Sequence, residues 1–304
     1  MEQRRGETHL HFANKPAARA GTVTFGDDLV VNRMGFGAMR LTGPGIIGPP
    51  ADRSEAIKVL RRAVELGVNF IDTAAAYGPY VSEELIAEAL HPYPDGLAIA
   101  TKGGLDRPGP DQWTPNGQRD QLRRVLEGSL RRLRVERIDL WQLHCLDPAV
   151  SDDAQFETLA EFVREGKVRH VGLADVDIDE IHRAQSHIPI ASVQNRYNVF
   201  DRRWDSVIDY CERHRLAFIP WFPLGAGALR SVVHEERARE RVESVARRHE
   251  ATVLQVALAW LLDRSSAMLV IPGTSKVKHL EENVAAADLK LDEADLRILA
   301  RVMA

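Results

Sequence analysis

Four side chains that can hold or move a proton follow three consecutive apolar runs of the sequence. Asp72, Lys102 and His144 each stand at or near the end of a run, and Tyr77 follows Asp72 by five residues. A tyrosine hydroxyl has a pKa of about 10, and a nearby ammonium group lowers that pKa. A carboxylate can keep the ammonium charged, and a histidine can donate a hydrogen bond to a developing oxyanion. The set predicts general-acid chemistry, in which a carbonyl oxygen is protonated while a nucleophile attacks its carbon.

Each of these side chains alone has a commoner structural interpretation. A single aspartate at the end of a strand is most often a turn or capping residue, and a single lysine is usually solvated. A single histidine or tyrosine is more often part of the packing. Their position after matching apolar runs favours a shared site, because the C-terminal ends of neighbouring parallel strands meet at one edge.

The elements that must position these residues alternate along the chain from about residue 30. Short apolar runs of strand length are followed by longer segments with helical periodicity. One such segment, 51–67, has Asp52 and Ser54 as candidate N-caps and Gly67 as a C-cap. The runs cover residues 34–39, 68–73, 97–102, 138–144, 168–175, 191–198, 216–223 and 268–273. Eight such repeats predict an α/β protein with a (β/α)8 barrel, also called a TIM barrel.

A doubly wound sheet is the competing architecture, and it would place a glycine-rich phosphate loop directly before a helix. The sequence GPGIIG at residues 43–48 has the spacing of that loop, but PPADR follows it and Pro44 removes a backbone donor. We therefore interpret 43–48 as a loop over the barrel mouth. The glycines and prolines of residues 103–118 fit either a mobile lid or a static surface loop.

Further segments flank the predicted barrel. Residues 21–33 have the pattern of a hairpin around Gly26 that closes the bottom of the barrel. Residues 233–250 and 252–264 predict extra helices between the seventh and eighth runs, and LDEADLRILARVM predicts a short amphipathic helix at the C-terminal end. We expect a disordered tail over residues 1–20 and a single barrel domain over residues 21–304.

Composition excludes several classes of function. The 304 residues carry a net charge of −4, which does not favour nucleic-acid binding. No stretch approaches the roughly 20 apolar residues of a membrane span, and the N-terminal residues lack the apolar run of a secretory signal. The two cysteines, Cys145 and Cys211, form no metal-ligand spacing. These features predict a cytoplasmic protein without a metal site, and they do not determine its oligomeric state.

With these motifs, the chain resembles the aldo-keto reductase superfamily from about Thr22 to its C-terminal end. The matching motifs are F-I-D-T-A-x-x-Y-G, A-T-K-G, L-W-Q-L-H, V-Q-N-R-Y-N and I-P-G-T-S-x-x-x-H-L-x-E-N. The resemblance implies a (β/α)8 barrel and NADPH-dependent reduction of an aldehyde or ketone. It implies that Tyr77 is the general acid, that Lys102 and Asp72 tune it, and that His144 orients the carbonyl group.

The resemblance also assigns cofactor contacts to the strand ends. Gln194 would bind the nicotinamide carboxamide, Trp221 would stack on the ring, and Ser275 would lie near the 2′-phosphate. The full implied set is Gly37, Met39, Asp72, Ala174, Asp175, Gln194, Trp221, Phe222, Pro223, Leu224, Gly225, Gly273, Thr274, Ser275, Lys276, His279, Glu282 and Asn283. Helix capping is the alternative role for Thr274 and Ser275.

Two departures from the family pattern keep the cofactor open between NADPH and NADH. Ala174-Asp175 stands where relatives have a serine and a polar residue, and His279 stands where an arginine is common. The blocks LTGPGIIGPP and PWFPLG resemble a bacterial branch that includes pyridoxal reductases, which implies an aromatic or vitamer aldehyde as substrate. The candidate pocket wall, which is apolar, consists of Phe36, Met39, Ile46, Ile47, Trp113 and Cys145.

Two other functions fit the same residues. The Ala174-Asp175 departure motivates a nicotinamide-binding sensor or accessory protein with little turnover. The acid–base residues would also serve an isomerase or lyase that acts on a biosynthetic intermediate without consuming a cofactor.

Overall fold

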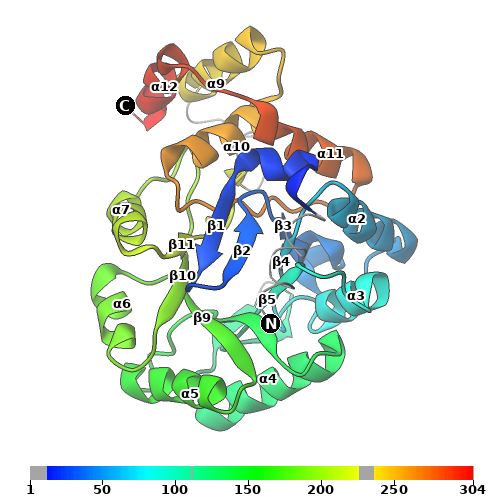
Figure 1. Cartoon of the computed structure of the whole chain (residues 1–304), viewed down its shortest axis with the longest axis vertical. Coiled ribbons are helices and arrows are strands. Elements are labelled where there is room, and N and C mark those ends of the chain that lie inside the picture. Colours follow the sequence, from blue (N-terminus) through cyan, green and yellow to red (C-terminus); the bar gives the residue numbers. More distant parts are fainter. Residues whose placement is uncertain (1–11, 111, 226–235, 304) are drawn as a thin grey trace.

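The computed structural model describes residues 12–110, 112–225 and 236–303, and parallel strands form its centre. The strands are β3 (Phe36–Gly37), β4 (Phe70–Asp72), β5 (Ala98–Gly103), β8 (Ile138–Leu143), β9 (Val168–Ala174), β10 (Ile190–Gln194) and β11 (Ala217–Phe218). They pair in the order β11-β10-β9-β8-β5-β4-β3, each parallel to its neighbour. In Figure 1 the sheet curls on itself and helices surround it.

The eighth predicted run closes this sheet into a barrel, although it is not a regular strand. Met34 forms a parallel bridge with Val270, and Phe218 forms one with Met268. The Leu269 backbone N–H donates to the Phe218 carbonyl oxygen at 2.9 Å. Both neighbours, β3 and β11, are only two residues long, so no continuous ladder forms. The prediction of a (β/α)8 barrel is confirmed, with its last run present as an extended closing segment.

An antiparallel hairpin lies across one end of the barrel, as the sequence predicted. It consists of β1 (Thr22–Phe25) and β2 (Leu29–Asn32), and Gly26 in its turn has φ 55°. The Phe25 ring stacks on Phe70 with ring centroids 5.3 Å apart. Phe25, Leu29 and Val31 share one buried cluster with the inward-facing residues of the strands. The hairpin therefore closes the apolar interior of the barrel (Figure 1).

Helices cover the outside of the barrel, where a second and larger apolar cluster packs between strands and helices. They are α2 (Arg53–Glu65), α3 (Val81–Leu90), α4 (Arg119–Leu133), α5 (Asp152–Arg164), α6 (Ile178–Gln185), α7 (Asp205–His214), α9 (Glu236–Arg248), α10 (Val253–Arg264), α11 (Val277–Ala285) and α12 (Glu293–Ala300). Of the two candidate N-caps of α2, Asp52 is the one used, because its side chain accepts the Glu55 backbone N–H at 2.9 Å. Gly67 follows that helix with φ 94°.

The helices α9 and α10 occupy the predicted positions between the seventh and eighth runs, and α12 is the predicted C-terminal helix. Figure 1 shows α9 and α12 together at one side of the barrel. Arg248 at the end of α9 and His249 just after it both contact the buried carboxylate of Asp295 in α12, at 2.5 Å and 2.6 Å. This contact fixes the extra helices to each other.

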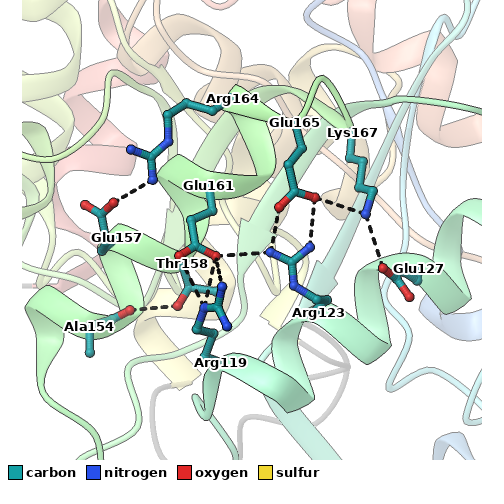
Figure 2. Close-up of polar contacts among 10 residues, drawn as sticks. All are labelled: Arg119, Arg123, Glu127, Ala154, Glu157, Thr158, Glu161, Arg164, Glu165 and Lys167. Carbon is teal, nitrogen blue, oxygen red and sulfur yellow. Dashed lines mark hydrogen bonds and ion pairs between the residues drawn. The ribbon is translucent and has the colours of Figure 1, made fainter.

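The arginine-rich face of α4 forms ion pairs with α5 and the residues that follow it. Arg123 contacts Glu165 at 2.6 Å, and Arg119 contacts Glu161 at 2.8 Å. Figure 2 shows how Lys167 extends this network to Glu127. Exposed ion pairs stabilise a fold by about 0–1 kcal/mol each, so the network fixes the order of neighbouring helices more than it adds stability.

Two segments differ from their predictions. Within the predicted disordered tail, residues 1–11 lie outside the described residues, but residues 16–20 form a 3-10 helix with Ala17 fully buried. The Ala17 backbone N–H donates to the Leu66 carbonyl oxygen at 2.9 Å, so the small side chain packs under the end of α2. Residues 103–118, predicted as a loop, contain the antiparallel hairpin of β6 (Leu105–Gly109) and β7 (Gln112–Pro115).

Within the described residues, no helix has the length and apolar character needed to cross a bilayer. In that same part of the chain, no group of three or more His, Cys, Asp or Glu side chains is placed to hold a metal ion.

Candidate active site

A cavity of about 1070 Å³ opens at the C-terminal ends of the barrel strands. This volume reaches the upper end of the range of about 300–1,000 Å³ that is usual for ligand sites. Asp72, Tyr77 and His144, which the sequence singled out, line this cavity, and so does the segment before α11. The predicted site residues that line it are Gly37, Met39, Asp72, Tyr77, His144, Ala174, Asp175, Gln194, Trp221, Phe222, Pro223, Leu224, Gly273, Ser275 and Lys276.

Asp72 and Lys102 form a buried ion pair beneath this cavity. Lys102 Nζ lies 2.5 Å from Asp72 Oδ1 and 2.8 Å from the Thr73 carbonyl oxygen. The other carboxylate oxygen of Asp72 accepts from the side-chain amides of Gln142 and Gln194, at 3.0 Å each. Burial lowers the pKa of Lys102, and Asp72 opposes that change. Register explains the contact, because β4 and β5 are neighbours and both side chains point inward.

Tyr77 lies over this pair with only 7% of its surface exposed. Its ring centroid is 5.4 Å from Lys102 Nζ and 5.9 Å from the His144 ring centroid. Burial raises the pKa of Tyr77 well above 10, and the charges of Asp72 and Asp175 add to this effect. The sequence argument expected the ammonium to lower that pKa, and this was wrong for the structure described. Lys102 is already paired with Asp72, so burial decides the direction.

His144 follows β8 and lies half-buried in the cavity wall beside Tyr77. Burial lowers the pKa of His144 well below 6.5, and the nearby cations Lys102 and Arg107 lower it further. The imidazole is therefore neutral at neutral pH. Among the described residues, no hydrogen-bond partner reaches its buried Nδ1 atom. The proton of the neutral ring is then better placed on Nε2, because an unpaired donor would be costly at Nδ1.

Arg107, whose charge acts on His144, belongs to the β6–β7 hairpin, and the sequence did not predict this hairpin. The Arg107 guanidinium lies 3.7 Å from the Trp113 ring centroid, and its Nη2 donates to the Gly45 carbonyl oxygen at 2.7 Å. Trp113 lines the cavity and meets the Tyr77 and His144 rings edge-on. The hairpin thus forms one wall of the site and joins the 44–46 segment over the mouth, where the sequence had placed residues 43–48.

Asp175 and Trp221 form another part of the wall. Trp221 Nε1 donates to Asp175 Oδ1 at 2.8 Å, and the Asp175 backbone N–H donates to the Gln194 carbonyl oxygen at 3.1 Å. Asp175 has φ 54°, a left-handed conformation that aspartate tolerates better than most residues. Packing around Asp175 raises its pKa, and the Trp221 hydrogen bond opposes this.

The end of the cavity next to α11 contains exposed groups that suit an anion. Ser275 and Lys276 line the cavity just before α11, whose first N–H groups carry partial positive charge. Glu55 of α2 also lines this end, and its Oε1 accepts the Val277 backbone N–H at 3.3 Å. Arg40 and Asp52 complete this end of the wall and, like Glu55, were not predicted. All three lie in segments that the sequence identified only as loop or helix start.

Several predicted residues do not line the cavity. Lys102 lies beneath it, and Thr274 is buried with its hydroxyl accepting the Lys276 backbone N–H at 3.2 Å, which resembles the capping alternative. The others are Gly225, His279, Glu282 and Asn283 of the cofactor set, and Phe36 and Ile47 of the expected pocket wall. Phe36 instead belongs to the fully buried core. Met39, Ile46, Trp113 and Cys145 of that wall do line the cavity.

Comparisons with known proteins agree with this architecture. Residues 33–304 match the model of the aldo/keto reductase family. An uncharacterized oxidoreductase of Schizosaccharomyces pombe is 51% identical over 90% of this chain and 87% of its own length. Pyridoxine 4-dehydrogenase of Escherichia coli is 42% identical over 88% of this chain and 94% of its own. An aldo-keto reductase of Klebsiella pneumoniae in complex with NADPH superposes with a TM-score of 0.78, at 26% identity, over 93% of this chain and 94% of that one.

Proposed function

The chain belongs to the aldo/keto reductase family and is an oxidoreductase, and on that premise we propose that it reduces an aldehyde or ketone to an alcohol with NADPH. The observation that carries the proposal is the meeting of Tyr77 and His144 in one cavity, above the buried Asp72–Lys102 pair. These groups can hold a carbonyl oxygen and deliver a proton to it.

The donor and acceptor groups of the cavity fit a nicotinamide dinucleotide. When bound, this cofactor supplies a hydride. Gln194 Nε2 donates to Asp72 and Gln142, and no donor from the described residues reaches its side-chain Oε1, which can accept from a carboxamide. Ser275 and Lys276 provide a hydroxyl and an ammonium for phosphate beside the start of α11. The complex of the Klebsiella pneumoniae relative with NADPH supports the choice of cofactor.

Each residue of the site has one role in the proposed reaction. Tyr77 holds its proton at neutral pH because burial raises its pKa, so it can act as an acid. Neutral His144 donates its Nε2–H to the carbonyl oxygen and orients it. The Lys102–Asp72 pair fixes the floor beneath Tyr77 and, through Gln194, the wall beside it. Negative charge that develops on the oxygen is met by two fixed donors, with no reorganisation of solvent.

The substrate that we propose is an aromatic aldehyde of the pyridoxal type. Met39, Ile46 and Trp113 give the mouth an apolar wall, which favours a flat aromatic ring. The relative from Escherichia coli is named for dehydrogenation of pyridoxine, which is the reverse direction of the same kind of reaction.

The test is NADPH oxidation by the purified protein with a panel of carbonyl compounds, with Tyr77→Phe in parallel. The panel contains pyridoxal, a simple aromatic aldehyde, a keto ester and a quinone. We expect turnover by the native protein and a loss of about 10²–10⁴-fold in the variant, since the variant lacks only the acidic proton. NADPH binding, measured by fluorescence, should be nearly unchanged.

Ordinary turnover by Tyr77→Phe would exclude Tyr77 as the acid. NADPH binding by the native protein without turnover on any compound would instead support a sensor or accessory role. Turnover that consumes no cofactor would point to an isomerase or lyase.

A further inference from the structure

Asp175 places a carboxylate in the wall of the cavity, held from three directions. Its left-handed backbone conformation turns it out of β9, and its backbone N–H donates to the Gln194 carbonyl oxygen of β10. Its side chain accepts the Trp221 indole N–H at 2.8 Å. The side chain lies open to the cavity, which it lines together with Tyr77. Asp175 is therefore a fixed charge at the site and not a mobile surface residue.

Asp175 forms no direct ion pair within the part of the chain that the structure describes. The two arginines whose fields reach Asp175, Arg196 and Arg203, both form their ion pairs with Asp201, at 3.2 Å and 2.8 Å. By contrast, Asp72 is neutralised by Lys102 at 2.5 Å. The field of Asp175 extends to the reaction centre, since it is one of the charges that raise the pKa of Tyr77.

The proposed reaction places the nicotinamide ring near this charge. Hydride and proton are added to the two ends of one carbonyl bond, so the ring must lie beside the carbonyl group that Tyr77 protonates. Reacting atoms approach to about 3–3.5 Å before transfer. The reduced ring is neutral and the oxidised ring carries one positive charge. A carboxylate in the adjoining wall therefore interacts differently with the two forms.

We infer that Asp175 discriminates between the two oxidation states of the cofactor and binds the oxidised form preferentially. This inference rests on the proposed function and deepens it. As the hydride leaves the ring with two electrons, the ring becomes cationic beside the carboxylate, while the carbonyl carbon gains the hydride and its oxygen gains the Tyr77 proton. Asp175 thus stabilises the charge that develops during reduction, which favours alcohol formation on the protein and slows release of the oxidised cofactor.

The test is equilibrium binding of NADP⁺ and NADPH, measured separately by calorimetry, for the native protein and for Asp175→Asn. Asparagine keeps an oxygen that can accept the Trp221 hydrogen bond, and it tolerates the left-handed backbone. We expect Asp175→Asn to weaken NADP⁺ binding about tenfold, as expected for losing one charge–charge interaction in a partly solvated site. NADPH binding should change by no more than about twofold, because the reduced ring is neutral.

Asp179→Asn is the matched control. Asp179 is an exposed carboxylate of α6, four residues further along the chain, and its removal changes the net charge by the same amount. It should leave both affinities unchanged. A hydrogen bond that Asp175 accepts from the carboxamide N–H would serve both oxidation states alike and cancel in the ratio of the two affinities.

An unchanged ratio in Asp175→Asn would overturn the inference, whether both affinities fall together or neither changes. An equal change of the ratio in Asp179→Asn would also overturn it, because the effect would then come from overall charge. If the native protein bound neither NADP⁺ nor NADPH, the proposed function itself would be refuted. That outcome can be told apart from an unchanged affinity ratio, which overturns only the inference about Asp175.

Discussion

Replacement of Lys102 by methionine isolates the energetic contribution of the buried ion pair under the site. The Lys102 side chain is fully buried and that of Asp72 is 3% exposed, so neither charge is solvated. Methionine fills most of the space of the lysine chain but leaves Asp72 with only its two amide donors. The Thr73 carbonyl oxygen also loses its donor. We therefore expect a large loss of stability rather than a local adjustment.

The magnitude follows from the cost of an unpaired buried charge. Removal of one partner of a buried pair typically costs about 3–5 kcal/mol of unfolding free energy, because the remaining charge has no compensation. At this chain length, about 2 °C of melting temperature corresponds to each kcal/mol, so the expected decrease is about 6–10 °C. In Asp72→Asn/Lys102→Met, both charges are absent, and the loss should be smaller than the sum of the single losses by about 0.5–3 kcal/mol.

The assay is unfolding in urea and on heating, followed by circular dichroism, for both single variants and the double variant. Arg123→Met is the control, since it breaks the half-buried surface pairs with Glu165 and Glu161 in Figure 2 by the same kind of substitution. It should cost less than about 1 kcal/mol. If the losses of Asp72→Asn and Lys102→Met simply add in the double variant, the two charges do not depend on each other and the reasoning is refuted.

Two further variants test the site and the closure of the barrel. The pKa of His144 in the folded protein lies well below 6.5, so the unfolded chain binds an extra proton as the pH falls below 6.5, and stability decreases there. His144→Gln should therefore lose less stability than the native protein between pH 7.5 and 5.5 in urea unfolding. Equal losses would contradict the lowered pKa. In Gly37→Ala, the new Cβ would lie 2.7 Å from the Ile271 carbonyl oxygen, so we expect a loss of about 1–3 kcal/mol. Gly109→Ala, whose Cβ meets only ordinary contacts, should be neutral, and a neutral Gly37→Ala would contradict the tight closure.

The barrel was predictable because its signal repeats. Each apolar run and each amphipathic segment supports the same alternation of strand and helix. A strand shorter than its apolar run, such as the two-residue β3, does not change that overall pattern. The β6–β7 hairpin was not predictable in this way. Its glycines and prolines are typical of loops, and its pairing is supported by contacts of Asp106 with Asn116 and Gln121, which no short-range pattern reveals.

The site was predictable to the extent that it follows strand register. Asp72, Lys102 and His144 stand at the ends of adjoining strands, so order along the chain implies proximity. Glu55 and Arg107 could not be found by this rule. Their positions depend on tertiary packing. Glu55 is placed by the packing of α2 beside α11, and Arg107 by the folding of the hairpin over the mouth of the cavity.

The electrostatics of Tyr77 show where an argument from residue types reaches its limit. Proximity to Lys102 suggested an acidified phenol, but Asp72 cancels that cation, and burial together with Asp72 and Asp175 raises the pKa. A phenol that resists ionisation is still a competent acid in the proposed reaction, because the oxygen it meets becomes an alkoxide, which is a stronger base than a phenolate. In the proposed reaction, we therefore expect the proton to move as negative charge builds on that oxygen. The same environment that opposes ionisation of free Tyr77 therefore keeps its proton in place until the substrate oxygen needs it.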